Sequence, residues 1–419
     1  MEFAYRWNLG ENSAQDDTHG VSQNIFIKRR KNMKNVKRVF LIVLDSVGAG
    51  EAPDAAAFGD VGAHTLESVY NTGKLNIPNL ISLGIGNVDG LDFLGKTDAP
   101  LASVARLCEL SGGKDTTIGH WEIAGHVSHR PLPTFPEGFP SEIVEKLESA
   151  FGRKIICNKP YSGTKVLEDF GDEHLRTGAL IVYTSADSVL QIAAHKSIVP
   201  LEQLYEYCRQ ARQIMQGDDF GVGRIIARPF DTVDGVFKRT AERHDYSIEA
   251  PDGLLPETVM KAGLDSIAVG KISDIFAAKG FTKAIFTHSN TEGMEVTAQV
   301  AGEDFHGLCF VNLVDFDMLW GHRRDAIAYA EGINAFDKWL GDFIKTLGED
   351  DMLMITADHG CDPAFEKTTD HTREYTPLIM YRKGEQSVNY GTVTGFNAIA
   401  ATAADALGVA LDCGGKVLA

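Results

Sequence analysis

Acidic and histidine side chains gather just after aliphatic runs that have the composition of buried strands. The runs and the side chains that follow them are residues 39–44 with Asp45, residues 310–314 with Asp315, Asp317 and His322, and residues 352–355 with Asp358 and His359. A further pair, Asp370 and His371, lies in a polar stretch. Carboxylate oxygens and imidazole nitrogens together bind ions such as Zn²⁺ and Mn²⁺. Because ligands bind at the carboxyl ends of strands in open α/β sheets, the pattern predicts a metal site at that edge.

The candidate ligands are more numerous than one ion needs, so the sequence predicts two divalent ions. Paired ions suit phosphoryl transfer because they clamp the attacking and leaving oxygens. Within the stretch from Asp315 to His322 we expect Asp317 to be a ligand and Asp315 to support the ligands from behind. Two alternatives stay open at this point. Asp45 could cap a helix, and Cys361 could be a ligand, although a neighbour of the site is the simpler interpretation.

Two adjacent hydroxyl groups supply a candidate nucleophile. In residues 110–122, small residues and Lys114 precede Thr116 and Thr117, and an apolar-leaning segment follows. Backbone N–H groups at a helix N-terminus can hold a phosphate beside such a hydroxyl. Taken alone, the stretch could equally be an ordinary capped helix start.

Composition and charge exclude some classes of function. The chain has 419 residues and a net charge of −18, from 40 Lys and Arg against 58 Asp and Glu. This acidic balance argues against nucleic acid as a partner, since such binding needs a basic face. No apolar run approaches the roughly 20 residues of a membrane span, so we expect no membrane partner. The six cysteines are scattered without a C-x-x-C pair, which favours a reducing, cytoplasmic location.

The strands that position these side chains belong to a split α/β domain. Strand, helix and strand alternate with the spacing of parallel βαβ units in the first and last parts of the chain. A proline-rich stretch begins at Pro131, and the core pattern resumes at Pro251. We therefore expect core segments at residues 36–131 and 250–419, with a smaller α/β domain inserted at residues 132–249. The Ala-rich stretch 392–407 predicts a helix.

The first 35 residues differ in composition from the rest of the chain. They are polar, without periodicity, and end in a basic patch. We expect residues 1–35 to be a disordered extension and the functional protein to begin near Met33. Deletion of residues 1–32 should then leave activity intact.

Arginines concentrate in the predicted insert. Arg224 and Arg228 lie in a strand-like run, and Arg239 and Arg243 follow shortly after. In an acidic protein such a group favours a bound anion, because guanidinium forks match phosphate oxygens. A salt-bridged surface is the alternative.

The combined motifs resemble the alkaline phosphatase superfamily and, within it, the bacterial phosphopentomutase family. They are Asp45-Ser-Val-Gly, Gly113-Lys-Asp-Thr116, Asp317 to His322, Asp358-His359-Gly360, Asp370-His371-Thr-Arg-Glu, and Tyr183 to His195. The resemblance runs from about Val36 to the C-terminus. It implies an alkaline-phosphatase-like core with a mainly parallel central sheet, helices on both faces and an inserted α/β cap. It also implies two divalent ions, usually Mn²⁺, and a sugar bisphosphate as activator.

The resemblance further implies an isomerase that interconverts the 1-phosphate and 5-phosphate of ribose or deoxyribose. Thr116 would carry the phosphoryl group, and the intermediate would be a 1,5-bisphosphate. Thr117, the next residue, is the alternative carrier. By similarity, the residues of the two metal sites are Asp45, Asp358 and His359, and Asp317, His322 and His371. The residues expected to meet the sugar are Ser185, Asp187 and Val189, and those expected to hold the distal phosphate are Arg224, Arg239 and Lys271.

Three other functions are alternatives to this one. A cofactor-independent phosphoglycerate mutase shares the core but uses a serine carrier and another cap. A metal-dependent phosphatase or sulfatase would release phosphate instead of returning it. A metal-binding module without catalysis would leave Thr116 and the cap unexplained. We expect a pentose phosphate as the partner and a monomer as the oligomeric state.

Overall fold

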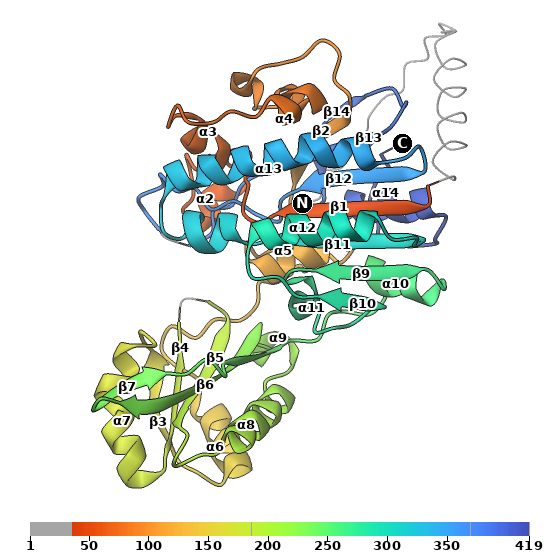
Figure 1. The fold of residues 1–419 in the computed structure, drawn as a ribbon. Coiled ribbons are helices and arrows are strands. Elements are labelled where there is room, and N and C mark those ends of the chain that lie inside the picture. The colour runs from red at the N-terminus through yellow and green to blue at the C-terminus, as the bar shows by residue number, and fades with distance from the viewer. Residues whose placement is uncertain (1–35, 186, 369, 419) are drawn as a thin grey trace, which may run out of the picture.

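The chain forms two separate β-sheets, each covered by helices (Figure 1). The structure is a computed structural model that describes residues 36–185, 187–368 and 370–418. The predicted extension at residues 1–35 lies outside the described residues. Among the described helices, none combines the length and the hydropathy needed to cross a bilayer.

The larger sheet has eight strands in the order β10-β9-β11-β1-β12-β13-β2-β14. Their bounds are β1 (Arg38–Leu44), β2 (Ser103–Cys108), β9 (Asp265–Val269), β10 (Lys283–Ile285), β11 (Gly307–Leu313), β12 (Asp351–Thr356), β13 (Thr376–Arg382) and β14 (Asn389–Thr394). The strands from β10 to β12 run parallel, and β13 is antiparallel to both of its neighbours. Parallel strands covered on both faces read as continuous aliphatic runs, which explains why β1 was visible in the sequence.

Helices cover both faces of this sheet. One face packs against α3 (Thr65–Tyr70), α4 (Pro78–Leu83), α12 (Asn290–Ala301) and α13 (Ala326–Thr346). The other face packs against α5 (Thr116–Ile123), α10 (Leu255–Lys261), α11 (Ile272–Ile275) and α14 (Asn397–Leu407). Shorter elements are α2 (Ala55–Phe58), the 3₁₀ turns η1 (Ile85–Asn87) and η2 (Asp92–Leu94), and the π-helix η3 (Phe316–Gly321).

The second sheet lies below the first in Figure 1 and is formed only by residues between Ile155 and Ser247. Its strands are β3 (Ile155–Pro160), β4 (Leu180–Thr184), β5 (Val189–His195), β6 (Arg224–Val233), β7 (Val236–Arg239) and β8 (His244–Ser247). Its helices are α6 (Ser141–Phe151), α7 (Lys165–Thr177), α8 (Leu201–Ile214) and α9 (Gly217–Phe220). We call this part the cap.

This architecture confirms the predicted α/β class, with a mainly parallel central sheet, helices on both faces and a smaller inserted α/β unit. All elements of the cap lie within residues 132–249, while the exact borders of that insert stay a prediction. One element differs from its prediction. The expected helix over 392–407 begins only at Asn397, because residues 392–394 pair with β2 as the edge strand β14.

Register brings the ends of the three central strands to one edge of the sheet. Leu44 pairs with Leu313, and Val43 pairs with Thr356. The residues that follow these strands therefore emerge side by side, although those after β1 lie about 270 or more positions from the others in the chain. This edge is where the predicted ligands are found.

Candidate metal centre and nucleophile

Six side chains predicted as metal ligands meet at the carboxyl edge of the larger sheet. They are Asp45 after β1, Asp317 and His322 after β11, Asp358 and His359 after β12, and His371 in the loop before β13. Asp45, Asp358 and His359 are at most 1% exposed. Burial of three such groups is costly unless they are paired or bind a cation.

Asp317, His322 and His371 form the first group that could hold a metal ion. The His371 Nε2 atom lies 3.3 Å from Asp317 Oδ1, and the His322 Nε2 atom lies 3.4 Å from Asp317 Oδ2. The Nε2 atoms of the two histidines are 3.1 Å apart. Imidazole nitrogens that face each other at this distance are suited to a shared cation.

The π-helix η3 explains how Asp317 and His322 come together. The backbone N–H of His322 donates to the Asp317 carbonyl at 3.1 Å, which is a turn of five residues. Residues five apart lie on the same side of a π-turn, whereas an α-helix would separate them. Single π-turns of this kind are frequent at functional sites.

A second group forms around the Nε2 atom of His359. Asp358 Oδ2 lies 3.2 Å from this atom and Asp45 Oδ1 lies 3.6 Å from it. Asp45, His359 and Asp317 also offer ligand atoms within 4.8 Å of one another. Asp317 is therefore common to both groups, a feature that the sequence did not reveal.

Three buried carboxylate oxygens in this centre have no hydrogen-bond partner. They are Oδ1 of Asp45, Oδ1 of Asp317 and Oδ2 of Asp358. Their close contacts to His120, His359 and His371 do not satisfy them, since each ring nitrogen carries at most one proton and faces more than one polar atom. Orphaned carboxylates that converge on imidazole nitrogens fit divalent cations, so the residues present agree with the predicted metal.

The shifted pKa values of Asp45 and His359 also support a bound cation. Burial raises the pKa of Asp45 well above its usual value, and the neighbouring charges of Asp358 and Asp317 add to this effect. Burial also lowers the pKa of His359 to about 4, so its imidazole is neutral at pH 7. A neutral imidazole is the form that binds metals. Crowded acids beside a neutral histidine are a centre that a cation would stabilise.

The predicted nucleophile Thr116 lies beside this centre, at the start of α5. The Thr116 Oγ1 atom is 3.1 Å from His359 Nε2. Asp115 caps the helix, and its Oδ1 atom accepts the backbone N–H groups of Thr117 and Ile118, both at 3.1 Å. By capping the helix, Asp115 aligns the first turn of α5 so that the Thr116 hydroxyl faces the candidate ligands.

Asp315 and Cys361 lie next to the centre. Asp315 Oδ2 accepts the backbone N–H of Asn290 at 2.6 Å and thereby ties the loop after β11 to α12. The Cys361 sulfur lies 4.0 Å from His322 Nδ1. Burial raises the pKa of the Cys361 thiol to about 11, so it is protonated at pH 7. Neither group of candidate ligands includes Cys361, which agrees with a neighbour of the site.

The predicted sugar contacts gather at one end of the cap. Ser185 and Asp187 lie between β4 and β5, where the Asp187 backbone N–H donates to Ser185 Oγ at 3.3 Å. Val189 begins β5 and pairs with Arg224, the first residue of β6. Burial raises the pKa of Asp115 in the core, and the charge of Arg224 is among those that oppose this rise. Arg224 therefore places positive charge from the cap near the start of α5.

Arg239 and Lys271 contact other parts of the protein. Arg239 Nε donates to the Gly163 carbonyl at 3.0 Å. Its charge acts on the buried hydroxyl of Tyr183, which has no hydrogen-bond partner in the described part of the chain. Lys271 lies in the core at the start of α11, where its charge acts on Asp274. The structure thus brings Arg224 toward Thr116, but gives Arg239 and Lys271 other neighbours.

Comparison with known proteins identifies the family. A family model described as the metalloenzyme superfamily matches residues 37–411. A protein named phosphopentomutase from Lachnoclostridium phytofermentans is 55% identical over 361 residues, covering 85% of this chain and 92% of the relative. Another of that name from Acetivibrio thermocellus is 47% identical over 383 residues, covering 91% and 98%.

The chain belongs to the phosphopentomutase family, within the metalloenzyme superfamily. The predicted family is confirmed, and so is the enzyme class, an isomerase that acts as a metal-dependent phosphomutase. Among solved structures, the PH0037 protein from Pyrococcus horikoshii aligns with a TM-score of 0.47 and 12% identity, covering 90% of this chain and 98% of that chain.

Three buried residues that the sequence motifs did not indicate orient the side chains of this phosphomutase. The Nδ1 atom of His120 lies 2.8 Å from the Thr116 carbonyl and 3.1 Å from Asp358 Oδ2. Asn312 Nδ2 donates to Asp45 Oδ2 at 2.7 Å, and the Ser46 backbone N–H donates to Asp358 Oδ1 at 3.1 Å. A signal existed for His120, because residues four apart share one face of a helix.

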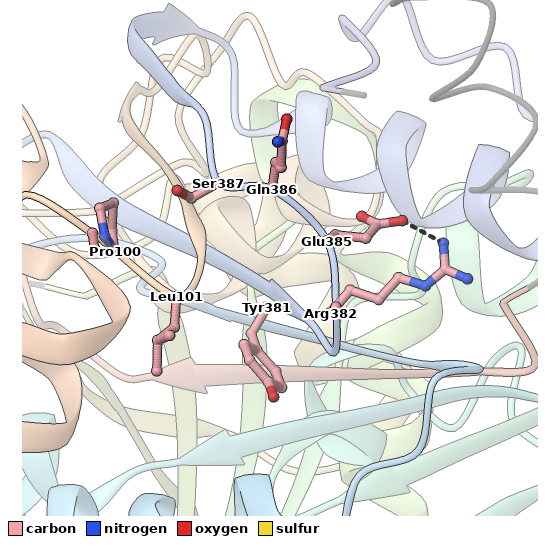
Figure 2. A pocket seen from close by; sticks show the side chains of 9 residues that line it. Pro100, Leu101, Tyr381, Arg382, Glu385, Gln386 and Ser387 are labelled. Atoms are coloured by element: carbon pink, nitrogen blue, oxygen red, sulfur yellow. Dashed lines mark hydrogen bonds and ion pairs between the residues drawn. The ribbon is translucent and has the colours of Figure 1, made fainter.

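A separate hollow lies at the opposite end of the sheet (Figure 2). It has a volume of about 540 Å³. Its lining includes Pro100, Leu101, Tyr381 and Arg382, and Arg382 is paired with Glu385 at 2.7 Å. This hollow is at the end of β13, whereas His371 precedes its start. It is therefore not part of the phosphomutase site.

Proposed function

We propose that this phosphomutase interconverts the 1-phosphate and 5-phosphate of ribose and deoxyribose through a phosphorylated Thr116. The observation that carries the proposal is the position of the Thr116 hydroxyl at a helix N-terminus, 3.1 Å from His359 Nε2 and beside two groups of candidate ligands. The relatives named phosphopentomutase supply the pentose phosphate as substrate class. A hydroxyl alone is a poor nucleophile, so its place in this centre is what makes it a candidate carrier.

The transfer consists of two steps that conserve the phosphate. Phosphothreonine 116 gives its phosphoryl group to the free hydroxyl of the sugar phosphate, and the product is a 1,5-bisphosphate. The Thr116 oxygen then takes back the phosphoryl group from the other end of the sugar. The N-terminal end of α5 would lie beside the phosphate in both states, and its helix dipole would favour the negative charge there. A sugar bisphosphate would prime an unphosphorylated enzyme by the second step.

Each of the two groups of candidate ligands would hold one divalent ion. Asp45, Asp358 and His359 would hold one divalent ion, and Asp317, His322 and His371 would hold the other. Such ions, when bound, lower the pKa of a coordinated hydroxyl and neutralise charge on a transferred phosphoryl group. Asp317 lies within reach of both sets, so its carboxylate would tie them together.

The cap has two tasks in this proposal. Ser185, Asp187 and Val189 would contact the sugar, and Arg224, Arg239 and Lys271 would bind the phosphate that is not being transferred. The cap must also exclude water, because hydrolysis of phosphothreonine would empty the enzyme. The positive charge of Arg224 near the start of α5 supports a phosphate located between cap and core.

The experiment compares transfer with hydrolysis. Purified enzyme is given ribose 5-phosphate with and without ribose 1,5-bisphosphate, and both ribose 1-phosphate and inorganic phosphate are measured. We expect primed conversion with little phosphate release. Release of phosphate as the main product would indicate a related phosphatase instead.

Two adjacent variants locate the carrier. Thr116→Ala should abolish conversion while the bound metal stays. Thr117→Ala is the matched control, since Thr117 contributes a backbone N–H to Asp115 that the substitution keeps. Retained turnover in Thr116→Ala, or its loss in Thr117→Ala alone, would contradict the assignment.

Mn²⁺ as the resident metal, a monomeric state and a cytoplasmic location stay predictions. Elemental analysis, light scattering and cell fractionation, in that order, would check them.

A further inference from the structure

A single buried arginine organises the loop that leads to Thr116. Arg373 is 2% exposed and lies two residues after His371. Its Nε atom donates to Asp54 Oδ1 at 3.0 Å, and its Nη1 atom is paired with the carboxylate of Glu109. Full burial of a guanidinium is uncommon unless every donor has a partner.

Most of these partners are backbone carbonyls of one short loop. Arg373 Nη1 donates to the Gly113 carbonyl at 2.6 Å. Arg373 Nη2 donates to the carbonyls of Ser111 at 2.8 Å and Glu109 at 3.2 Å. Three alternate carbonyls thus point inward to one side chain. Residues 109–113 curl around the guanidinium, and Thr116 follows three residues later.

The same loop is held from its other side by α5. The Glu122 carboxylate accepts the backbone N–H of Leu110 at 2.9 Å and that of Ser111 at 2.6 Å. The carbonyls therefore bind Arg373 while the N–H groups bind Glu122. Buried backbone groups need such partners, so the loop has one preferred conformation.

The segment that carries Arg373 also carries a candidate ligand. The Nδ1 atom of His371 is 3.0 Å from the Lys114 carbonyl. The backbone N–H of Arg373 and the Lys114 ammonium both donate to Asp60 Oδ2 at 2.8 Å. Residues 371–373 and 109–114 are consequently joined at several points. A shift of one would move the nucleophile relative to the ligands.

We propose that Arg373 is a positioning residue for phosphoryl transfer, which sets the place of Thr116 against the metal-ligand side chains by holding residues 109–113. This inference rests on the proposed role of Thr116. Lysine cannot replace the arginine, because its three donors share one point and cannot reach three separate carbonyls and two carboxylates.

The test measures the phosphorylation of Thr116 directly. Metal-loaded Arg373→Lys enzyme is mixed with excess ribose 1,5-bisphosphate, and phosphate on Thr116 is followed in a single turnover. We expect a rate about 10²-fold below wild type, because misplacement by about 1 Å has that effect. Bound metal per chain and the affinity for ribose 5-phosphate should stay near wild type.

Arg38→Lys is the matched control. Like Arg373, Arg38 donates to a carboxylate and to a backbone carbonyl. Its Nε and Nη2 atoms donate to the two carboxylate oxygens of Asp351, and its Nη1 atom donates to the Ala301 carbonyl at 2.8 Å. It begins β1, at the opposite end of the strand from Asp45. Arg38→Lys should lower the melting temperature yet keep the full rate of phosphorylation in the folded protein.

The possible results separate the inference from the proposed function. A wild-type rate in folded Arg373→Lys, or an equal loss in Arg38→Lys, would overturn the positioning role while the function stands. A wild-type enzyme that never carries phosphate on Thr116 would overturn both. If Arg373→Lys does not fold, Glu109→Gln serves instead, since it removes the charge that fixes Nη1. An unchanged rate in Glu109→Gln would then reject the inference.

Discussion

The hydroxyl oxygen of Thr116 lies 3.1 Å from the Nε2 atom of His359, although 243 positions separate the two residues in the chain. The same nitrogen faces Asp358 Oδ2 at 3.2 Å and Asp45 Oδ1 at 3.6 Å. One ring nitrogen cannot satisfy three oxygens with a single proton. The arrangement is explained by a cation in the centre and a hydroxyl placed beside it.

Asp317 should control the metal content of both groups. Since its carboxylate belongs to each candidate set, Asp317→Asn should reduce bound metal at both positions, whereas His322→Gln should reduce it at one. Elemental analysis of purified protein gives the metal per chain. Asp315→Asn is the control, because this acid binds the Asn290 backbone instead. Equal metal content in Asp317→Asn and His322→Gln would contradict the shared role.

Metal affinity should increase with pH. Burial lowers the pKa of His371, but the negative charge of the nearby Asp317 carboxylate opposes burial and the pKa is raised to about 9. Because metal must displace this proton, affinity for Mn²⁺ should rise between pH 6.5 and pH 9. Calorimetric titration at several pH values measures this trend, and a flat profile would contradict it.

The metal-free protein should show the opposite trend in stability. A histidine has a pKa of about 6.5 when unfolded, so the raised pKa in the fold stabilises the protonated state. That contribution is fully present below about pH 6.5 and is lost as pH rises through about 9. Chemical denaturation of metal-free protein should therefore give a lower free energy of unfolding at pH 9 than at pH 6.5. His371→Gln should reduce the difference.

Arg239→Ala should weaken substrate binding more than it slows chemistry. A hydrogen bond to a charged group contributes about 1.5–3 kcal/mol, so KM for ribose 5-phosphate should rise about 10- to 10²-fold. Steady-state kinetics separate KM from kcat. Arg209→Ala is the control, because Arg209 is an exposed arginine of α8 that pairs with Glu206. An unchanged KM would remove Arg239 from the site.

Gly119→Ala should displace α5 from the metal centre. A Cβ atom at this position would lie 2.3 Å from the Asp358 carbonyl oxygen, so α5 and the loop after β12 must separate. Overpacking of this kind costs about 1–3 kcal/mol of stability, and misplacement of Thr116 should lower kcat by about 10²-fold. Gly348→Ala is the control, since its nearest contact would be an ordinary 3.6 Å. Full activity in Gly119→Ala would show that the close approach is dispensable.

The ligands could be predicted from sequence because most of them directly follow buried parallel strands. An aliphatic run that ends in an acid reveals both the strand and the edge at which its side chain emerges. Asp45 and Asp358 are of this kind. His371 follows no strand, and only its neighbouring acid and the family resemblance indicated it.

The relations between the ligands could not be predicted. The sharing of Asp317 depends on a π-turn that brings His322 to its side, and no residue type signals such a turn. Asn312 lies within an aliphatic strand, where a polar residue reads as an interruption, yet it orients Asp45. The edge strand β14 was missed because Ala-rich helix signals begin only three residues after it ends. In each case the structure depends on contacts between residues far apart in the chain, which the local sequence pattern does not specify.

The most direct test of the account is the position of the carried phosphate. Metal-loaded enzyme is incubated with ribose 1,5-bisphosphate, and its intact mass and fragment masses are then determined, with Thr116→Ala treated in parallel. We predict one added phosphoryl group, located on Thr116 and lost on addition of excess ribose 5-phosphate, and none on Thr116→Ala. Phosphate on Thr117 or on another residue, or an unmodified wild-type enzyme that still converts its substrate, would contradict it.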